Sequence, residues 1–94
     1  MKYTIKFTTQ FKRDLKLAKK QNKNIDKLFE IIEILANGNQ LPAKYRDHEL
    51  TGNYKGHLEC HILPDLLIIW LQYDEEQNEI YLVRVGSHSE LFKK

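Results

Sequence analysis

The chain has 94 residues, of which 41% are hydrophobic and 30% charged, so it can form one domain, residues 1–94, with a single modest core. Its net charge is only +2, and its single cysteine excludes an internal disulfide, so nothing points to an oxidising compartment. The longest apolar run, residues 66–71, is far shorter than the roughly 20 residues of a membrane span. With no signal-peptide pattern at the start, we expect a cytoplasmic protein without membrane contact.

The basic residues are concentrated near the start of the chain. Residues 2–27 hold nine lysines and arginines against two aspartates. Such a cluster suits an anionic partner, either nucleic acid or an acidic protein, but a solvated helix face would have the same composition.

One strand and two helices are predicted in the first part of the chain. Apolar residues alternate over residues 3–7, which is the pattern of a strand. Thr8 or Thr9 can cap the helix that follows, and Asn24 can cap a second helix with apolar residues at helical spacing up to Leu35. An Asn-Gly pair then ends this second helix.

The second part of the chain reads as a long loop and three strands. Residues 39–55 have no periodicity, and we expect a loop there. Residues 57–62 alternate, Pro64-Asp65 suits a tight turn, and residues 66–71 are apolar throughout, as in a central strand covered on both faces. A last strand spans residues 79–86, where simple alternation places Val83 with Val85 and Leu82 with Arg84.

These elements predict an α+β fold in which two N-terminal helices pack on a four-stranded antiparallel sheet, in the order β-α-α-β-β-β. The first strand is expected at an edge of the sheet. Ser87 and Glu90 fit a capping box that starts a short C-terminal helical turn. The helices would cover one face and leave the face with His57, Glu59 and His61 partly open.

A metal site is the first function to test, because all four histidines follow position 47. His57 and His61 are four residues apart, which on a strand is ~13 Å at ~3.3 Å per residue. Ligands of one zinc lie ~2 Å from it, so the two cannot bind the same ion. No zinc-binding motif accompanies them, and we expect neither a metal nor another cofactor.

Acid–base catalysis is the second function to test. His61, Asp65, Arg84 and His88 would converge if the first two flank the hairpin corner and the last strand runs beside it. Cleavage of RNA needs a base for the 2′-OH, an acid for the departing 5′ oxygen and a cation for the phosphate, which histidine and arginine can supply. Incidental polar side chains on an exposed sheet face would give the same pattern.

Three motifs carry a family resemblance. Residues 45–56 (YRDHELTGNYKG), 59–65 (ECHILPD) and 86–92 (GSHSELF) resemble the motifs of the YafQ branch of the RelE/ParE toxin superfamily. The resemblance implies two N-terminal helices on a four-stranded antiparallel sheet. It also implies a small bacterial toxin that cuts mRNA on the ribosome without a metal and is silenced by an antitoxin from the same operon.

The resemblance also assigns site residues. The family's catalytic positions fall on His48, His61, Asp65 and His88, and its phosphate-binding arginine on Arg84. We expect His88 to protonate the leaving oxygen, and the other histidines with Asp65 to activate or orient the 2′-OH. Which of them is the base stays open.

Contacts to RNA or the ribosome are expected from basic and aromatic residues outside the catalytic set. They are Lys12, Arg13, Lys16, Lys19, Lys20, Arg46, Lys55 and Phe92. The best-known member of the family has tryptophan where this chain has Leu66, so a base-stacking contact would be absent and the codon preference stays open.

Two other functions fit the same fold. A gyrase-inhibiting toxin of the ParE type would need no catalytic histidines, and the set of His48, His61, Asp65 and His88 argues against it. A non-catalytic module that binds RNA or protein would use the basic helix and leave the histidines incidental.

Overall fold

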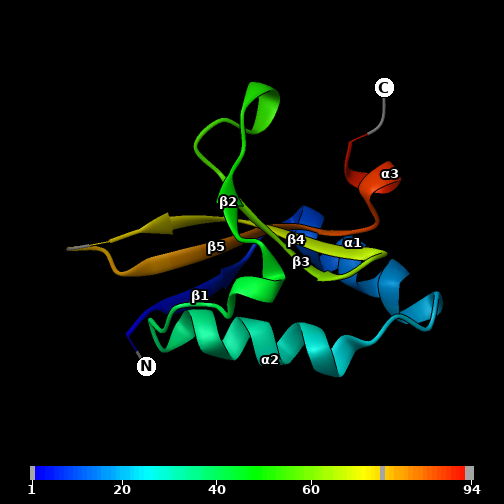
Figure 1. Cartoon of the computed structure of the whole chain (residues 1–94), viewed down its shortest axis with the longest axis horizontal. Helices are drawn as coiled ribbons and strands as arrows, with labels where there is room; N and C mark the ends of the chain where they lie inside the picture. Colours follow the sequence, from blue (N-terminus) through cyan, green and yellow to red (C-terminus); the bar gives the residue numbers. More distant parts are fainter. Residues whose placement is uncertain (1, 75, 93–94) are drawn as a thin grey trace.

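The computed structural model describes residues 2–74 and 76–92. Besides two short 3₁₀ turns at Ala43–Tyr45 and Gly52–Tyr54, it contains the helices and strands shown in Figure 1. In chain order they are β1 (Thr4–Phe7), α1 (Thr9–Lys20), α2 (Ile25–Ala36), β2 (His48–Glu49), β3 (Leu58–Leu63), β4 (Leu66–Tyr73), β5 (Glu79–Gly86) and α3 (His88–Leu91).

The sheet has five strands in the order β1-β5-β4-β3-β2. The α+β class is confirmed, and so is the edge position of the first strand, but the four-stranded antiparallel sheet is wrong in two respects. β1 runs parallel to β5, because two helices and a hairpin separate them in the chain and allow a crossover. The predicted loop also contains β2, in which His48 pairs with Glu59 and Glu49 with Leu58.

The two long helices start at the predicted caps. The Thr8 hydroxyl accepts a hydrogen bond from the amide of Phe11 at 3.1 Å, and the Asn24 side chain accepts one from the amide of Lys27 at 3.1 Å. Past the end of α2, Gly38 has a φ of +74°, which favours glycine. The helix boundaries therefore follow from local sequence.

The main core lies between the helices and one face of the sheet. Phe11, Leu28 and Ile31 from the helices are fully buried in it, and the first five residues of β4 are all buried because β4 is the central strand. A smaller cluster covers the other face, where Leu67 and Ile69 pack with Leu91 from α3. Figure 1 shows α2 on one side of the sheet, and α3 and the loop before β3 on the other.

A bulge in β5 changes which side chains share a face. Ile69 pairs with Arg84 but Trp70 pairs with Leu82, so Val83 is an extra residue in β5. Val83 packs with the smaller cluster, whereas the next valine, Val85, is in the main core. The simple alternation expected for residues 79–86 is therefore wrong beyond Leu82.

The single cysteine is a structural residue, as the strand pattern predicts. Cys60 is fully buried, and burial raises the pKa of its thiol to about 12. A thiol with so high a pKa stays protonated and is a poor nucleophile. Trp70, only 2% exposed, is likewise part of the core.

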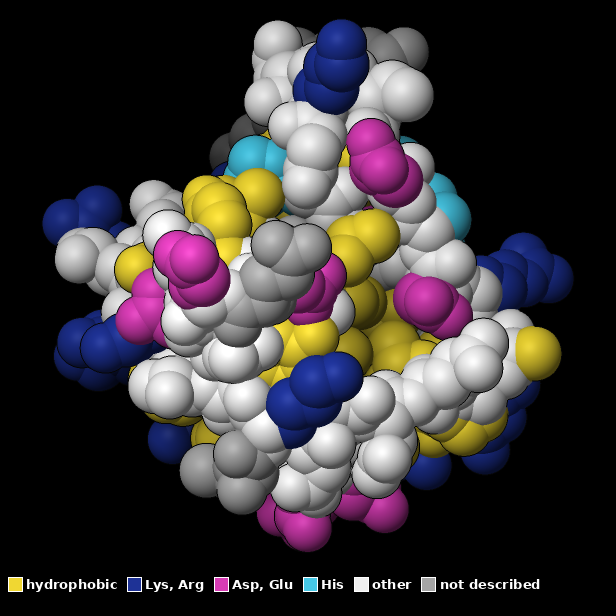
Figure 2. Space-filling model, turned by 90° about the vertical axis from the view of Figure 1, so that its left-hand side faces the viewer, with side chains coloured by type: hydrophobic (Ala, Val, Ile, Leu, Met, Phe, Trp, Pro, Cys, Tyr) yellow, Lys and Arg dark blue, Asp and Glu magenta, His cyan; other side chains and the backbone are white. Residues whose placement is uncertain are grey.

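The surface at the left-hand end of the molecule in Figure 1 differs from the sheet face that carries the histidines. In Figure 2 hydrophobic side chains are visible there in hollows between charged ones, and histidines are visible only at the two sides of the upper half of the view. None of the helices formed by the described residues is long and apolar enough to cross a lipid bilayer.

Candidate active site

The first polar group, here called the imidazole group, consists of His48, Glu59 and His61. The Glu59 side chain is only 5% exposed. Its Oε1 lies 3.2 Å from Nε2 of His48 and 3.5 Å from Nε2 of His61. The two imidazole rings are stacked, with centroids 6.1 Å apart.

Strand geometry brings these three side chains together. β2 pairs with β3 so that His48 lies directly opposite Glu59. His61 follows Glu59 by two residues in β3, and residues two apart on a strand point to the same face. The sequence placed Glu59 and His61 on that face but gave Glu59 no role. An acidic residue two positions before a strand histidine is the signal that could have indicated it.

The carboxylate of Glu59 is only partly paired. Its Oε2 is buried and has no hydrogen-bond partner among the described residues. A buried carboxylate with an unpaired oxygen is costly, and such groups need an explanation beyond stability.

The two imidazoles differ in what their second nitrogens meet. Nδ1 of His48 lies 2.7 Å from the carbonyl oxygen of Arg46, so both nitrogens of that ring face oxygen acceptors. For His61 only the Nε2 contact to Glu59 is present within the described part of the chain. When Nε2 of His61 carries the proton that faces Glu59, its Nδ1 has a lone pair available to accept another.

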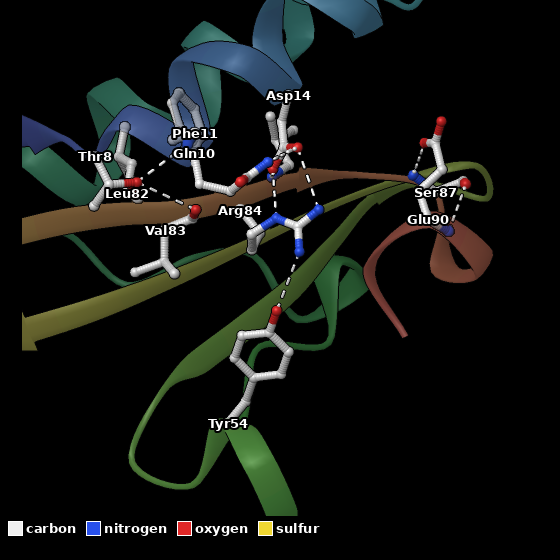
Figure 3. A network of polar contacts seen from close by, with 11 residues as sticks. Thr8, Gln10, Phe11, Asp14, Tyr54, Leu82, Val83, Arg84, Ser87 and Glu90 are labelled. Atoms are coloured by element: carbon white, nitrogen blue, oxygen red, sulfur yellow. Dashed lines mark hydrogen bonds and ion pairs between the residues drawn. The ribbon is translucent and has the colours of Figure 1, made fainter. Parts of the chain in front are cut away.

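The second polar group, here called the guanidinium group, is centred on Arg84 (Figure 3). Its Nε donates to Oδ2 of Asp14 at 2.7 Å, and its Nη2 donates to Oδ1 of Asp14 at 3.2 Å. On the other side, Nη1 donates to the Tyr54 hydroxyl at 3.3 Å. The hydrogen bonds to Asp14 raise the pKa of Arg84 above its ordinary value, so the guanidinium is a permanent cation.

Asp14 is a residue that the sequence analysis counted only as a charge. It is 9% exposed, although α1 carries mostly basic side chains around it. Its spacing of three from Phe11 and four from Ala18 places it on the apolar stripe of α1. A carboxylate on the buried stripe of a basic helix indicates a buried partner, and here the partner is Arg84.

His88 is linked to the guanidinium group through contacts between aromatic rings. The capping box predicted for α3 is confirmed: the Ser87 amide donates to Glu90 Oε1 at 2.8 Å, and the Glu90 amide donates to the Ser87 hydroxyl at 3.3 Å. The His88 ring packs on Phe92 with centroids 4.8 Å apart, and Phe92 packs edge-on against Tyr54 at 5.8 Å.

Sheet register places both groups on the face opposite α2. His61 pairs with Leu67, which pairs with Gly86, two residues before His88. Two residues further along β4, Ile69 pairs with Glu59 on one side and with Arg84 on the other. β3 and β5 are two strand spacings apart, about 10 Å, so the two groups flank a strip of β4 on one surface.

Asp65 lies in the β3–β4 turn, as predicted, but its side chain contacts Lys23 rather than a histidine. Its carboxylate accepts a hydrogen bond from Nζ of Lys23 at 2.7 Å, and this bond lowers the pKa of Asp65. Within residues 2–74 and 76–92, no hydrogen bond or ion pair joins Asp65 to a histidine. Its role in catalysis stays a prediction.

The side chains expected to contact RNA are accessible. The basic residues of α1 are all exposed, as are Arg46 and Lys55, and Phe92 is half-buried. A cavity of about 320 Å³ beside His61 is lined by Lys44, Arg46 and residues 62–64. Leu66 is fully buried and cannot stack on a base.

Comparison with known proteins places the chain in a class of bacterial toxins. The sequence model described as "Bacterial toxin of type II toxin-antitoxin system, YafQ" matches residues 3–93. The chain belongs to this YafQ toxin family, which confirms the resemblance of its three motifs.

Escherichia coli provides similar proteins of established name. The chain is 36% identical over 89 residues to "mRNA interferase toxin YafQ" of strain K12, covering 94% of each chain. The crystal structure of YafQ from strain BL21(DE3) has a TM-score of 0.88 at 34% identity, covering 96% of this chain and 98% of that one. The E. coli DinJ-YafQ complex gives 0.85 at 35% identity, with the same coverage.

A toxin from Helicobacter pylori, solved in a metal-bound form, has a TM-score of 0.85 and 40% identity, covering 96% of this chain and 99% of that one. In the part of this chain that the structure describes, no group of three or more His, Cys, Asp or Glu side chains has the arrangement of a metal site.

Proposed function

We propose that this protein is the toxin of a type II toxin–antitoxin system and an endoribonuclease that cleaves mRNA on the ribosome without a metal ion. The observation that carries the proposal is the placement of His61, paired with buried Glu59, on the same sheet face as Arg84 and His88. The name of the similar E. coli protein, mRNA interferase toxin, supports the reaction class.

His61 is the general base in this mechanism. Its Nε2 lies 3.5 Å from Oε1 of Glu59, so in this proposal the carboxylate favours the Nε2–H tautomer and stabilises the imidazolium that forms, as the carboxylate does in Ser-His-Asp triads. Its Nδ1 takes the proton of the 2′-OH, and the 2′ oxygen attacks the adjacent phosphorus. His48 lies 3.2 Å from the same carboxylate oxygen and orients it.

The other residues act on the leaving side of the phosphate. His88 gives a proton to the 5′ oxygen as the bond from phosphorus to that oxygen breaks, which leaves a 2′,3′-cyclic phosphate and a 5′-hydroxyl. Arg84 stabilises the negative charge that builds on the phosphoryl oxygens. Asp65, whose pKa is lowered, stays ionised and therefore orients the 2′-OH rather than donating a proton.

The partners follow from the same proposal. The cognate antitoxin is expected to be encoded in the same operon, and the DinJ-YafQ complex of the similar protein supports such a partner. The ribosome and its mRNA are the substrate, with RNA contacts from the exposed basic side chains of α1, from Arg46 and Lys55, and from Phe92. A substrate of this kind places the protein in the cytoplasm.

Two single substitutions test the assignment of base and acid. His61→Ala and His88→Ala should each lower the rate of mRNA cleavage at least 10²-fold, because positioned acid–base groups contribute 10²–10⁴-fold. The measurement is the appearance of new mRNA ends when purified protein is added to translating ribosomes, in parallel with protein that was dialysed against EDTA beforehand. Retained folding should be checked by thermal denaturation.

The control is Gln77→Ala, which changes an exposed residue between β4 and β5, outside both groups. This variant should cleave like the wild type. Wild-type protein that makes no new ends on ribosomes would refute the nuclease, and DNA-damage signalling on expression would then support a gyrase-directed toxin. Loss of all cleavage by the protein dialysed against EDTA would refute metal independence.

A further inference from the structure

We propose that Asp14 is a positioning residue for the cleavage reaction, holding Arg84 in the orientation that receives the phosphate. This inference rests on the proposed nuclease function and adds to it a residue from α1, outside the three sequence motifs. The observation behind it is the two-pronged contact of the Asp14 carboxylate with one edge of the guanidinium.

The contacts of Arg84 leave one edge of its guanidinium available for a phosphate. A guanidinium has five N–H donors in a rigid plane. Asp14 takes the edge formed by Nε and Nη2, and Tyr54 takes one donor of Nη1. The outer edge formed by Nη1 and Nη2 keeps one donor on each nitrogen, and this edge can bind two oxygens of a phosphate.

Asp14 is itself held firmly. Its Oδ2 also accepts the amide of Val85 at 3.1 Å, a bond buried from solvent. β1 pairs with β5 only from Glu79 to Leu82, so that amide lies beyond the paired part of this edge. Upstream, the Thr8 amide and hydroxyl both donate to the carbonyl of Leu82, at 3.2 and 2.9 Å. The start of α1 and the bulge of β5 are therefore tied together on both sides of the arginine (Figure 3).

Tyr54 fixes the guanidinium from the opposite side and connects it to His88. Its hydroxyl accepts a hydrogen bond from Nη1, and its ring packs against Phe92, which in turn contacts the ring of His88. A shift of Arg84 would therefore change its distance to the phosphate and its relation to the proposed acid. A misplacement of about 1 Å can cost 10²-fold in rate.

A double-mutant cycle distinguishes positioning from a general structural role. Asp14→Asn keeps the shape of the side chain and an oxygen for the Val85 amide but removes the charge that orients Arg84. We expect it to lower the single-turnover cleavage rate at saturating toxin by about 10- to 100-fold, with half-saturation nearly unchanged. In an Arg84→Ala background the same substitution should have no further effect on the rate.

The melting temperatures of the same variants test whether Asp14 has only a structural role. The bond from Asp14 to the Val85 amide does not involve the Arg84 side chain, so any loss of melting temperature that arises there should appear in both backgrounds. Asp26→Asn, a change of the same charge on exposed α2 surface, is the control and should cleave like the wild type. Asp14→Glu, which moves the carboxylate by one methylene, gives a second cycle if Asp14→Asn does not fold.

Each outcome decides a different question. An additive loss of rate in the Arg84→Ala background overturns the positioning role, because Asp14 then acts independently of the arginine. Full activity of Asp14→Asn overturns it as well. Full activity of Arg84→Ala itself removes Arg84 from the proposed mechanism, whereas inactivity of the wild type refutes the nuclease.

Discussion

Glu59 is a carboxylate that has been taken out of water on a β-strand, with two imidazoles as its polar neighbours. Burying an ion costs several kcal/mol unless its lone pairs are satisfied, and Oε2 of Glu59 meets no partner among the described residues. A glutamine or an apolar residue of similar size would be as stable or more so. In the proposed mechanism, the carboxylate is needed because it stabilises the imidazolium of His61.

Glu59→Gln should therefore separate stability from activity. The amide keeps the volume of the side chain but cannot stabilise the imidazolium of His61, and we expect the cleavage rate to fall by about 10²- to 10⁴-fold. The free energy of unfolding should stay the same or rise, since a buried charge is removed. Cleavage kinetics on ribosomes and urea denaturation measure the two quantities.

The exposed Glu49 of β2 offers a matched control. Glu49→Gln should change neither the cleavage rate nor the stability, because Glu49 is exposed. Wild-type cleavage by Glu59→Gln would show that His61 needs no carboxylate.

At this scale the sequence predicts which polar residues lie together better than it predicts burial. His48, His61, Arg84 and His88 were all identified from residue type and motif, and the structure gathers them on one face. Glu59 and Asp14 received no role, since a carboxylate on a strand or helix is normally solvated. Only the pairing of β2 with β3 and the packing of α1 on β5 turn these two acids inward.

Among the elements, α3 is the least able to stand by itself. It has four residues, far fewer than the number at which an isolated helix is even marginally stable. The Ser87–Glu90 capping box and the buried Leu91 hold it in place. The Glu90 carboxylate accepts the Ser87 amide, and this hydrogen bond lowers the pKa of Glu90 below its ordinary value of 4.5.

Glu90→Gln should destabilise the protein in a pH-dependent way. The lowered pKa means that the folded state favours the ionised carboxylate, so its contribution is complete above about pH 4.5 and disappears as the pH falls through the folded value. At pH 7 we expect a loss of about 1 kcal/mol, because the Ser87 amide then donates to a neutral oxygen instead of a charged one.

Urea denaturation of the wild type and Glu90→Gln at pH 7 and at the lowest pH where both still fold measures this difference. Glu76→Gln, an exposed acid outside any cap, should show no difference at either pH. A Glu90 contribution that persists unchanged in acid would mean that the cap does not depend on the carboxylate.

The elements also show which structural features local patterns can predict. The helix caps, the turn at Pro64-Asp65, the central position of β4 and the capping box of α3 all depend on neighbouring residues, and all are confirmed. The parallel β1, the two-residue β2 and the bulge at Val83 depend on partners more than eight residues away. Periodicity within a segment contains no information on such pairing.

At the scale of the whole molecule, the C-terminal end of the basic helix α1 lies close to the proposed catalytic residue His88. The side chain of Gln21, just after α1, donates to Glu90 of α3 at 3.0 Å, so the C-terminal end of α1 lies beside the helix that carries His88. Lys19 and Lys20 occupy the last turn of α1 and are exposed. With a net charge of only +2, attraction of RNA must depend on such local clusters.

This arrangement predicts that ribosome binding depends on where a positive charge lies. The double variant Lys19→Gln/Lys20→Gln should bind ribosomes more weakly than the wild type, and the slope of log affinity against log salt should fall by about 0.7–0.9 for each lysine that contacts a phosphate. The measurement is a binding titration at several salt concentrations. The same loss of charge in Lys2→Gln/Lys6→Gln, around β1 at the far edge of the sheet from β2, should leave both affinity and slope close to wild type. Equal weakening by both pairs would show that only net charge matters, and no weakening by the first pair would mean that the ribosome approaches another face.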